Sequence, residues 1–451
     1  MSLRLNAWVE RLRTSLFFVP MLFVIAGGAL GVAMVHLDSA WGDASSAPLF
    51  VSASTVESAR EILGVVAAAT ITVAGVAFSI SLLVIQQASS QYSPRVVHSL
   101  FRDPFNRRVM GFALGTFTYA LMVLRAVRSP IDEGGDPVIP NASVGLAVVL
   151  GVLAILAIVA FIDHNAHTME VSQILDRVTR ETIEQIDRAW PAERPHGGIQ
   201  QPNAPASEAH QVLVRKRGWI QQLDEGRLLD LVPHGGTIRL ETCPGRYAIE
   251  GTVLCSIWPT PSDPERIDQE ADGALQVGPS RTMQEDPTYG IRQLADVALL
   301  ALSPGVNDPS TAQDAIFHLA DVLNQALQRS LPPEAQRDER SRQFIRAERP
   351  TPESITKLAF DEIRRSAAAH PTVCIYLLEA LHLLAQSFAG ADPRRTDPVR
   401  EQADLVLASA EEADLPAADI REVRLAYAKR FGSPPPPHVA AGAFGPVGLS
   451  R

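Results

Sequence analysis

The sequence has few cysteines, and their spacing fits neither a disulfide framework nor a zinc site. Only three are present, Cys243, Cys255 and Cys374, and no two of them form a CxxC pair. An odd count argues against a disulfide framework, and the zinc sites that sequence patterns reveal need closely spaced pairs. We therefore expect these cysteines to be small buried residues.

An excess of positive charge is also missing. The 451 residues include 40 Lys and Arg against 50 Asp and Glu, which gives a formal net charge of −10 at pH 7. The phosphates of nucleic acids require a basic protein face, and no basic cluster supplies one here. The composition therefore argues against nucleic acid as a partner.

The signatures of common enzyme classes are absent as well. The chain contains no P-loop, no GxGxxG after a strand, no HExxH and no GxSxG, and it has no internal repeat. We therefore expect that the protein is not an enzyme and that it uses no cofactor.

Long apolar runs are what the sequence does contain. Hydrophobic residues make up 46% of the chain although 20% of its residues are charged, so the apolar residues must be concentrated. They form four runs nearly free of charge, at residues 16–37, 62–85, 109–124 and 144–162. Because about 20 apolar residues cross a bilayer as a helix, we predict an α-helical membrane domain with four transmembrane helices. The first run is longer than the apolar core of a signal peptide, so we expect it to be retained.

Basic residues in the short loops predict the orientation of these helices. One side carries the arginines of the N-terminal segment and of the loop after the second run, whereas acidic residues dominate the other side. The arginines are Arg4, Arg11, Arg13, Arg95, Arg102, Arg107 and Arg108. By the positive-inside rule, we expect both termini in the cytoplasm, and the lipid bilayer is the expected surrounding of the four runs.

The chain after residue 163 has the composition of a soluble protein, and its periodicity changes twice. Apolar residues at helical spacing first continue the fourth run to Pro191, which gives a predicted membrane domain of residues 1–190. A linker rich in Pro, Gly and polar residues follows. Short β-type runs with a turn at Pro244 and Gly245 then predict a small β-barrel or sandwich at residues 205–262.

Helical periodicity returns over residues 285–430 and predicts a helical bundle. Expected helices cover residues 289–302, 309–328, 351–370, 371–388, 397–411 and 415–430. Asp308 suits the N-cap of the second of these, with Pro309 at its first position. The Pro- and Gly-rich residues 432–451 are predicted to be a disordered tail. The fold class is thus a four-helix membrane domain followed by a cytoplasmic α+β region.

The second apolar run carries one face of small and polar side chains. On a helical wheel this face spans roughly 80°. Its members are Thr72, Gly75, Ser79, Leu82, Gln86 and Ser90; we call them the α-stripe. Small residues let helices pack closely in lipid, and hydroxyls bond across such a contact or back to their own helix. The first interpretation is therefore a packing seam.

The second interpretation is the wall of a water-filled pore formed by several copies of the chain. Hydroxyl and amide groups replace part of an ion's hydration without trapping it, and a single apolar ring gates by dewetting. Leu82 would form that ring. The polar residues from Gln86 to Ser90 favour the pore, because packing alone does not require them.

Ionisable residues are absent from the central part of all four apolar runs. Proton relays and charged substrate sites inside a membrane normally need such residues. The sequence therefore argues against a proton-coupled pump and leaves a passive path, with inorganic ions as candidate partners, open.

A candidate cation site follows the fourth run. Asp163, His164, His167 and Glu170 lie within eight residues, and Asp163, His167 and Glu170 share one helical face. Carboxylate and imidazole groups are suitable cation ligands. Polar residues where a helix leaves the bilayer are the simpler explanation, and the spacing leaves the presence of a metal open.

A third candidate site surrounds the stretch SPGVND. Ser303, Asn307 and Asp308 lie in it, and Arg292 and Asp296 precede it at i,i+4 spacing. The segment supplies no clear pairing of a nucleophile with a base. We interpret it as the end of one helix and the start of the next, with a ligand or subunit contact as the alternative.

Four stretches of the chain carry a family resemblance. They are VAAATITVAGVAFSISLLVIQQASSQYSPR, FRDPFNRRVMGFALGTFTYALMVLR, FIDHNAHTMEVSQI and DPTYGIRQLADVALLALSPGVNDPSTA. These stretches resemble bacterial predicted integral membrane proteins that are classed only as a domain of unknown function. The resemblance implies an inner-membrane protein with four N-terminal spans and a large C-terminal region, and it implies no activity.

Two functions remain as hypotheses. The first is a homo-oligomeric ion channel or passive pore lined by the second transmembrane helix. The second is a non-conducting membrane-anchored scaffold or sensor whose cytoplasmic region binds a partner or ligand. Self-association is expected in both cases, because a face of small residues needs a partner.

Overall fold

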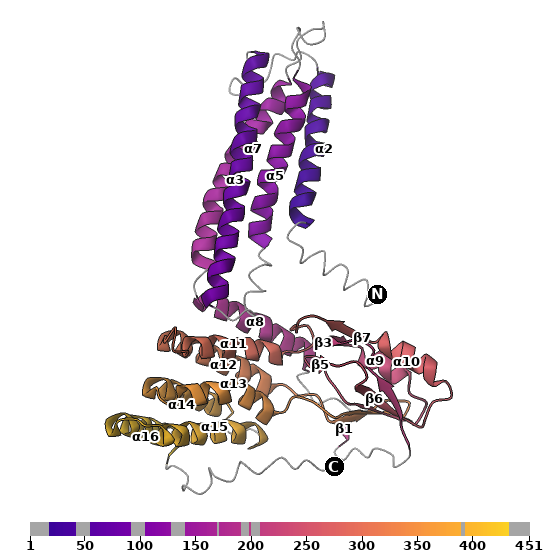
Figure 1. Cartoon of the computed structure of the whole chain (residues 1–451), viewed down its shortest axis with the longest axis vertical. Coiled ribbons are helices and arrows are strands. Elements are labelled where there is room, and N and C mark those ends of the chain that lie inside the picture. The colour runs from indigo at the N-terminus through magenta and orange to yellow at the C-terminus, as the bar shows by residue number, and fades with distance from the viewer. Residues whose placement is uncertain are drawn as a thin grey trace. The chain divides into compact units, whose positions relative to one another are not determined.

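The computed structural model describes residues 18–41, 55–91, 104–127, 140–168, 171–190, 198–199, 208–388 and 393–432. The chain divides into two compact units, Met1–Glu170 and Val171–Arg451 (Figure 1). The boundary between the two units therefore lies between residues 170 and 171, whereas the sequence analysis ends the membrane domain at residue 190. Residues 169 and 170, where the predicted helix would pass from one unit to the other, lie outside the described residues, as do residues 433–451 of the predicted tail.

In its described residues, the N-terminal unit contains four long helices that run side by side (Figure 1). They are α2 (Phe18–Trp41), α3 (Val56–Gln91), α5 (Pro104–Ala126) and α7 (Asn141–Thr168). Each contains one stretch long and apolar enough to cross a membrane. These stretches are Phe18–Ser39, Val56–Leu83, Phe105–Ala126 and Asn141–Asn165. The four predicted spans are confirmed.

Glycines bring α2 and α5 into close contact. Gly27 and Gly31 on α2 form one GxxxG spacing, and Gly111 and Gly115 on α5 form another. A Cβ atom added at Gly27 would lie 2.1 Å from the carbonyl oxygen of Gly115, and one added at Gly115 would lie 2.7 Å from that of Phe23. Small residues at these positions allow the two backbones to approach, which is how helices associate in lipid.

α3 packs on α5 and α7 through a face of mostly small residues. The buried members of this face are Ala59, Leu63, Ala67, Thr70, Ala74 and Ala77; we call them the internal seam. They recur every three or four residues, as one side of a helix requires. Tyr119 and Val123 of α5 and Ala147 of α7 complete the core around the first half of the seam.

The C-terminal unit contains a stack of helices on one side and, on the other, two sheets with α9 (Glu225–Asp230) and α10 (Pro264–Asp272) beside them (Figure 1). Its helices are α8 (Val171–Ala189), α9 (Glu225–Asp230), α10 (Pro264–Asp272), α11 (Thr288–Ala301), α12 (Pro309–Gln328), α13 (Pro352–Ala367), α14 (Pro371–Ser387), α15 (Pro393–Glu412) and α16 (Ala417–Phe431). In the described residues, α11 packs with α12, α13 with α15, and α14 with both α15 and α16. The α+β composition predicted for this region is confirmed.

The strands pair across long sequence distances. They are β1 (Gly198–Ile199), β2 (His210–Leu213), β3 (Gly218–Leu223), β4 (Thr237–Leu240), β5 (Tyr247–Ala248), β6 (Val253–Trp258), β7 (Leu275–Gly278), β8 (Ala335–Arg337) and β9 (Gln343–Arg346). One sheet has the order β1-β8-β9-β4-β6-β2 and the other the order β5-β3-β7. β4 and β9 pair in parallel, whereas the other pairs are antiparallel.

This topology differs from the predicted separation of a β-rich module at residues 205–262 from a helical domain at residues 285–430. β8 and β9 come from within the helical range and pair in the same sheet as β4 and β6. β7 and α10 lie between residues 262 and 285, where the sequence analysis predicts no helix or strand. The strands and helices therefore belong to one compact unit.

Two arginines fix β9 to the rest of this unit. The Nη1 atom of Arg342 donates to the carbonyl oxygen of Leu229 at 2.7 Å, and its Nε atom donates to Asp338 at 2.7 Å. Arg346 forms a two-pronged ion pair with Glu225, in which its Nε atom lies 2.9 Å from the carboxylate. Such forked pairs hold a side chain in one orientation. They explain why a hairpin distant in sequence stays bound to α9.

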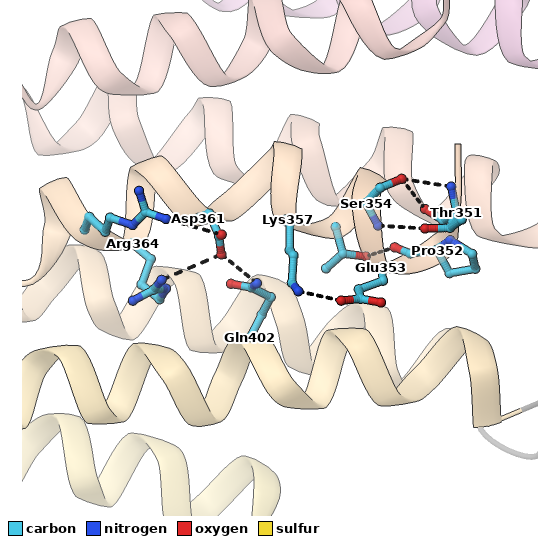
Figure 2. Close-up of polar contacts among 10 residues, drawn as sticks. Thr351, Pro352, Glu353, Ser354, Lys357, Asp361, Arg364 and Gln402 are labelled. Carbon is cyan, nitrogen blue, oxygen red and sulfur yellow. Dashed lines mark hydrogen bonds and ion pairs between the residues drawn. The ribbon is translucent and has the colours of Figure 1, made fainter. Parts of the chain in front are cut away.

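The predicted helix starts are confirmed by their caps. The Asp308 carboxylate accepts hydrogen bonds from the backbone N–H groups of Ser310 and Thr311, both at 3.1 Å, ahead of α12. Thr351 and Ser354 form a reciprocal capping box at the start of α13 (Figure 2). These side chains satisfy N–H groups that have no partner inside the helix.

α8 packs against α11 and α12 within the C-terminal unit. Its Thr179 hydroxyl lies 2.9 Å from Nδ1 of His318 on α12. A Cβ atom added at Gly290 of α11 would lie only 1.9 Å from the Thr182 hydroxyl, so α8 and α11 touch closely. This packing explains why the division between the units falls before α8.

Candidate functional site

The α-stripe and the internal seam lie on different faces of α3. Taking 100° per residue, the centres of the two faces are roughly 150° apart. Thr72, Gly75, Ser79, Leu82 and Gln86 are exposed, whereas the seam is buried against α5 and α7. The side chain of Ser90 lies outside the described residues. The helices of one chain therefore pack through the seam and leave the α-stripe uncovered.

The polar groups of the α-stripe bond within α3. The Thr72 hydroxyl donates to the carbonyl oxygen of Ala68 at 2.7 Å, and the Ser79 hydroxyl donates to that of Gly75 at 3.0 Å. A Cβ atom added at Gly75 would meet no atom within 4 Å. The hydroxyl groups of the α-stripe thus use their hydrogens within α3. Their oxygens can still accept hydrogen bonds from water or from another helix.

Large apolar side chains border the α-stripe. Phe78 on one side and Val65 and Leu83 on the other are exposed, and Leu82, within the stripe, is 46% exposed. Exposed apolar side chains on a candidate span suit lipid or another helix. The stripe is therefore a narrow polar strip within an otherwise apolar surface.

The candidate cation site is described only in part. Asp163 is exposed, and the ring of His164 lies against that of Phe105 with their centroids 4.7 Å apart. The side chains of His167 and Glu170 lie outside the described residues. Among the side chains that are described, no group of three His, Cys, Asp or Glu residues is placed to hold a metal ion.

A pair of amides beside this site was not singled out from the sequence. Asn106 on α5 and Asn165 on α7 exchange two side-chain hydrogen bonds, at 3.1 and 3.2 Å. Asn165 is buried and also donates to the carbonyl oxygen of Phe161 at 2.8 Å. Paired amides at a helix contact hold two spans in register. The signal in the sequence was an Asn just before the third apolar run and another just after the fourth, but no local pattern pairs them.

A second polar contact missed by the sequence analysis lies where α2 ends and α7 begins. The Asp38 carboxylate accepts a hydrogen bond from the Ser143 backbone N–H at 2.9 Å and another from its hydroxyl. The Tyr119 hydroxyl donates to the carbonyl oxygen of Ser143 at 2.9 Å. A carboxylate at a helix N-terminus satisfies unpaired N–H groups there. The sequence analysis had used this acidic region only for orientation.

Arg292 and Asp296 serve an internal contact. The Nε atom of Arg292 lies 2.7 Å from Asp296, and its two terminal nitrogens donate to Glu362 of α13 at 2.5 and 3.0 Å. Hydrogen bonding to Glu362 raises the pKa of the Arg292 guanidinium above its usual value. The guanidinium is therefore occupied by carboxylates of its own chain.

The SPGVND stretch forms the turn between α11 and α12. The carbonyl oxygen of Ser303 accepts from the Asn307 backbone N–H at 2.9 Å, and Asn307 adopts a positive φ of 48°. The hydroxyl and backbone N–H of Thr311 hold the pKa of the Asp308 carboxyl below its usual value. These contacts are those of helix ends, as the sequence analysis interpreted them.

Figure 2 shows a polar network between α13 and α15 that the sequence did not indicate. Asp361 accepts from the Gln402 amide at 2.8 Å, and it lies 3.7 Å from Arg364 and 3.5 Å from Arg365. Gln402 is buried. The network joins two helices of the stack, which is a structural role.

The three cysteines form no disulfide. Cys255 and Cys374 are buried, as expected, whereas Cys243 is half-buried. Burial, together with the nearby Glu348 carboxylate, raises the pKa of the Cys243 thiol to about 11. A thiol that stays protonated at neutral pH is a poor nucleophile and a poor metal ligand.

Comparisons with known proteins agree with the architecture. A family model described as predicted membrane protein (DUF2254) matches residues 13–382. The uncharacterized proteins Rv1290c of Mycobacterium tuberculosis and Mb1321c of Mycobacterium bovis are each 28% identical to the chain over 414 residues, which is 90% of this chain and 78% of the relative. No solved structure matches the chain.

Proposed function

We propose a passive transmembrane path for this protein, which belongs to the family of predicted membrane proteins DUF2254. Several copies of the chain would associate with their α-stripes around a common axis. The observation that carries the proposal is that the α-stripe faces away from the packing seam of its own chain. A polar face left uncovered on a span needs either water or another helix beside it.

The chemistry of the α-stripe suits weak interactions with ions. Its hydroxyl oxygens at Thr72 and Ser79, and the amide of Gln86, supply dipoles without a fixed charge. Such groups replace part of the hydration shell and release the ion again. Leu82 lies between these groups, and a ring of leucines from several copies would close the path by excluding water.

The proposal includes a location and an orientation. The basic residues of the loops favour the bacterial inner membrane with both termini in the cytoplasm. In that orientation Gln86 lies toward the cytoplasmic end of the path.

Single-channel recording of the purified protein in planar bilayers tests the proposal. Discrete currents in KCl and NaCl gradients are expected, and Thr72→Trp is expected to abolish them by filling the path. Phe78→Trp is the matched control, because Phe78 is also exposed on α3 but lies off the α-stripe. Leu82→Ser should increase the time spent open, since it replaces the apolar ring with a polar one.

The mass of the detergent-solubilised protein separates a pore from a seam. If the α-stripe lines a path, Thr72→Trp leaves the oligomer intact while current is lost. If the α-stripe is itself the contact between copies, the same variant lowers the oligomer mass measured by light scattering. The path would be contradicted if neither the parent protein nor Leu82→Ser gave current and if Thr72→Trp lowered the oligomer mass.

A non-conducting membrane-anchored scaffold or sensor is the second candidate. The hydroxyls of Thr72 and Ser79 each bond a carbonyl oxygen one turn earlier in α3. Because these hydroxyls are already satisfied in part, the α-stripe can also pack dry against another copy. In that case the function would lie in the C-terminal unit, through a partner or ligand bound there.

A further inference from the structure

A second uncovered surface lies on the β-rich side of the C-terminal unit, where two chain segments run side by side. Residues 213–219 and 247–253 run antiparallel, with pairing at both ends and a turn at Ile249–Thr252 between them. Val214 donates its backbone N–H to the carbonyl oxygen of Thr252 at 2.8 Å and accepts from Gly251 at 2.9 Å. Further along, Gly218 pairs with Ala248 in the β3–β5 ladder. We call these two segments the β-ribbon.

The β-ribbon exposes large apolar side chains. Leu213 is 46%, Tyr247 is 54% and Ile249 is 61% exposed. Only six large hydrophobic residues are exposed in the described part of the C-terminal unit, so half of them gather on this one feature. The ring of Trp219 packs edge-on against that of Tyr247, with centroids 5.5 Å apart. An apolar cluster of this kind marks an interaction site more often than scattered single residues do.

Three consecutive basic residues share the β-ribbon with this apolar cluster. Arg215, Lys216 and Arg217 are all exposed, and Glu250 is the acidic residue on the facing segment. Lys216 lies 2.9 Å from Asp272, and Arg215 lies 3.8 Å from Asp268, but both basic side chains stay at least half exposed. The β-ribbon thus carries three exposed basic side chains, two of them beside carboxylates of α10, next to exposed aliphatic and aromatic groups.

We propose that the β-ribbon docks onto an anionic membrane surface. Basic side chains attract the phosphates of acidic lipids, while aromatic and aliphatic groups enter the boundary between headgroups and acyl chains. Tyr and Trp in particular favour that boundary. The last candidate span ends at Asn165 and the C-terminal unit begins at Val171. A short stretch of chain therefore tethers this unit to the membrane that the span would cross. This inference is independent of whether α3 conducts.

Depth-dependent quenching on the full-length protein in vesicles tests this proposal. An environment-sensitive fluorophore is attached to Ile249→Cys in a Cys243→Ser background, in which the two remaining cysteines are buried. The vesicles contain phosphatidylcholine alone or with roughly a third phosphatidylglycerol, and some acyl chains carry a nitroxide quencher. Leu425→Cys on α16 is the matched control, because Leu425 is 64% exposed and lies away from the β-ribbon in the chain.

The proposal predicts quenching at position 249 only in the anionic vesicles, with no change at position 425. Lys216→Glu combined with Arg217→Glu should remove that quenching, and high salt should weaken it. Equal quenching at both positions in both kinds of vesicle would overturn the proposal. Shielding of position 249 that increases with protein concentration in detergent would also overturn it, since it would assign the β-ribbon to a contact between copies.

Discussion

Glycine positions in the four-helix unit differ sharply in what a side chain would meet there. Gly27 faces the backbone of Gly115, whereas Gly64 of α3 has open space around it. The same substitution therefore has opposite expected effects at the two positions. In a helix, Ala in place of Gly restricts the unfolded chain and favours folding where space allows.

We predict that Gly27→Ala destabilises the protein and that Gly64→Ala does not. The added methyl group at position 27 would force α2 and α5 apart, at a cost of about 1–3 kcal/mol. The thermal midpoints of both variants in the same detergent provide the comparison. Equal midpoints would show that α2 and α5 do not approach as closely as the structure has them.

The half-buried Cys243 gives a prediction for pH dependence. Because burial and Glu348 raise the pKa of its thiol to about 11, the neutral form persists well above neutral pH. At pH 8 the thiolate fraction, and with it the alkylation rate, should be about 200-fold below that of an ordinary thiol. The rate should be half-maximal near pH 11, whereas that of an ordinary thiol is half-maximal near pH 8.5. Cys243→Ser should abolish this slow reaction, and a half-maximal rate near pH 8.5 would contradict the assignment.

Single residues were predictable where their partners are close in sequence. Asp308 and Thr351 each accept a hydrogen bond from a backbone N–H only three residues further along the chain. The sequence alone was therefore enough to predict where these two helices start. Asn106 and Asn165 are 59 residues apart, and their pairing depends on how α5 and α7 pack. For the same reason, no local pattern indicated the contact between Asp38 and Ser143.

At the scale of elements, two arginines add polar contacts that hold the hairpin of β8 and β9 to α9. Arg342 is buried, and it bonds Asp338 of the hairpin and the backbone of Leu229 in α9. Removing the Arg342 guanidinium leaves the carbonyl oxygen of Leu229 without this hydrogen-bond donor.

We predict that Arg342→Met lowers the free energy of unfolding by about 2 kcal/mol, which is typical for a hydrogen bond to a charged group. Arg337→Met on the same hairpin is the control, since Arg337 is exposed. Chemical denaturation of the full-length protein measures both. If the two variants are equally stable, Arg342 does not fix the hairpin to α9.

Helices were easier to predict than strands for a physical reason. A helix of α12's length repeats its apolar face over several turns, and Asp308 and Pro309 mark its start. β7, β8 and β9 contain three or four residues each, too few for an alternating pattern to stand out. Their identity as strands comes from partners far away, such as β4 for β9. The sequence therefore indicated the class of the C-terminal unit and not its topology.

At the scale of the whole molecule, the candidate function depends on what covers the α-stripe. The stripe was visible in the sequence, because the helical period places its members together. Which face of α3 packs inside the chain was not visible, since the stripe and the seam are both made of small residues. The structure separates the two faces, and that separation supports the proposed path between copies.

Thiol accessibility in the bilayer tests this account most directly. Thr72→Cys and Ser79→Cys are compared with Phe78→Cys at the apolar border of the α-stripe and with Ala74→Cys in the internal seam, each in a Cys243→Ser background. If the α-stripe lines a water path, a charged, membrane-impermeant thiol reagent should modify positions 72 and 79 at least about tenfold faster than positions 74 and 78, because only a hydrated thiol ionises and reacts. Equally slow reaction at all four positions would contradict a water path along α3.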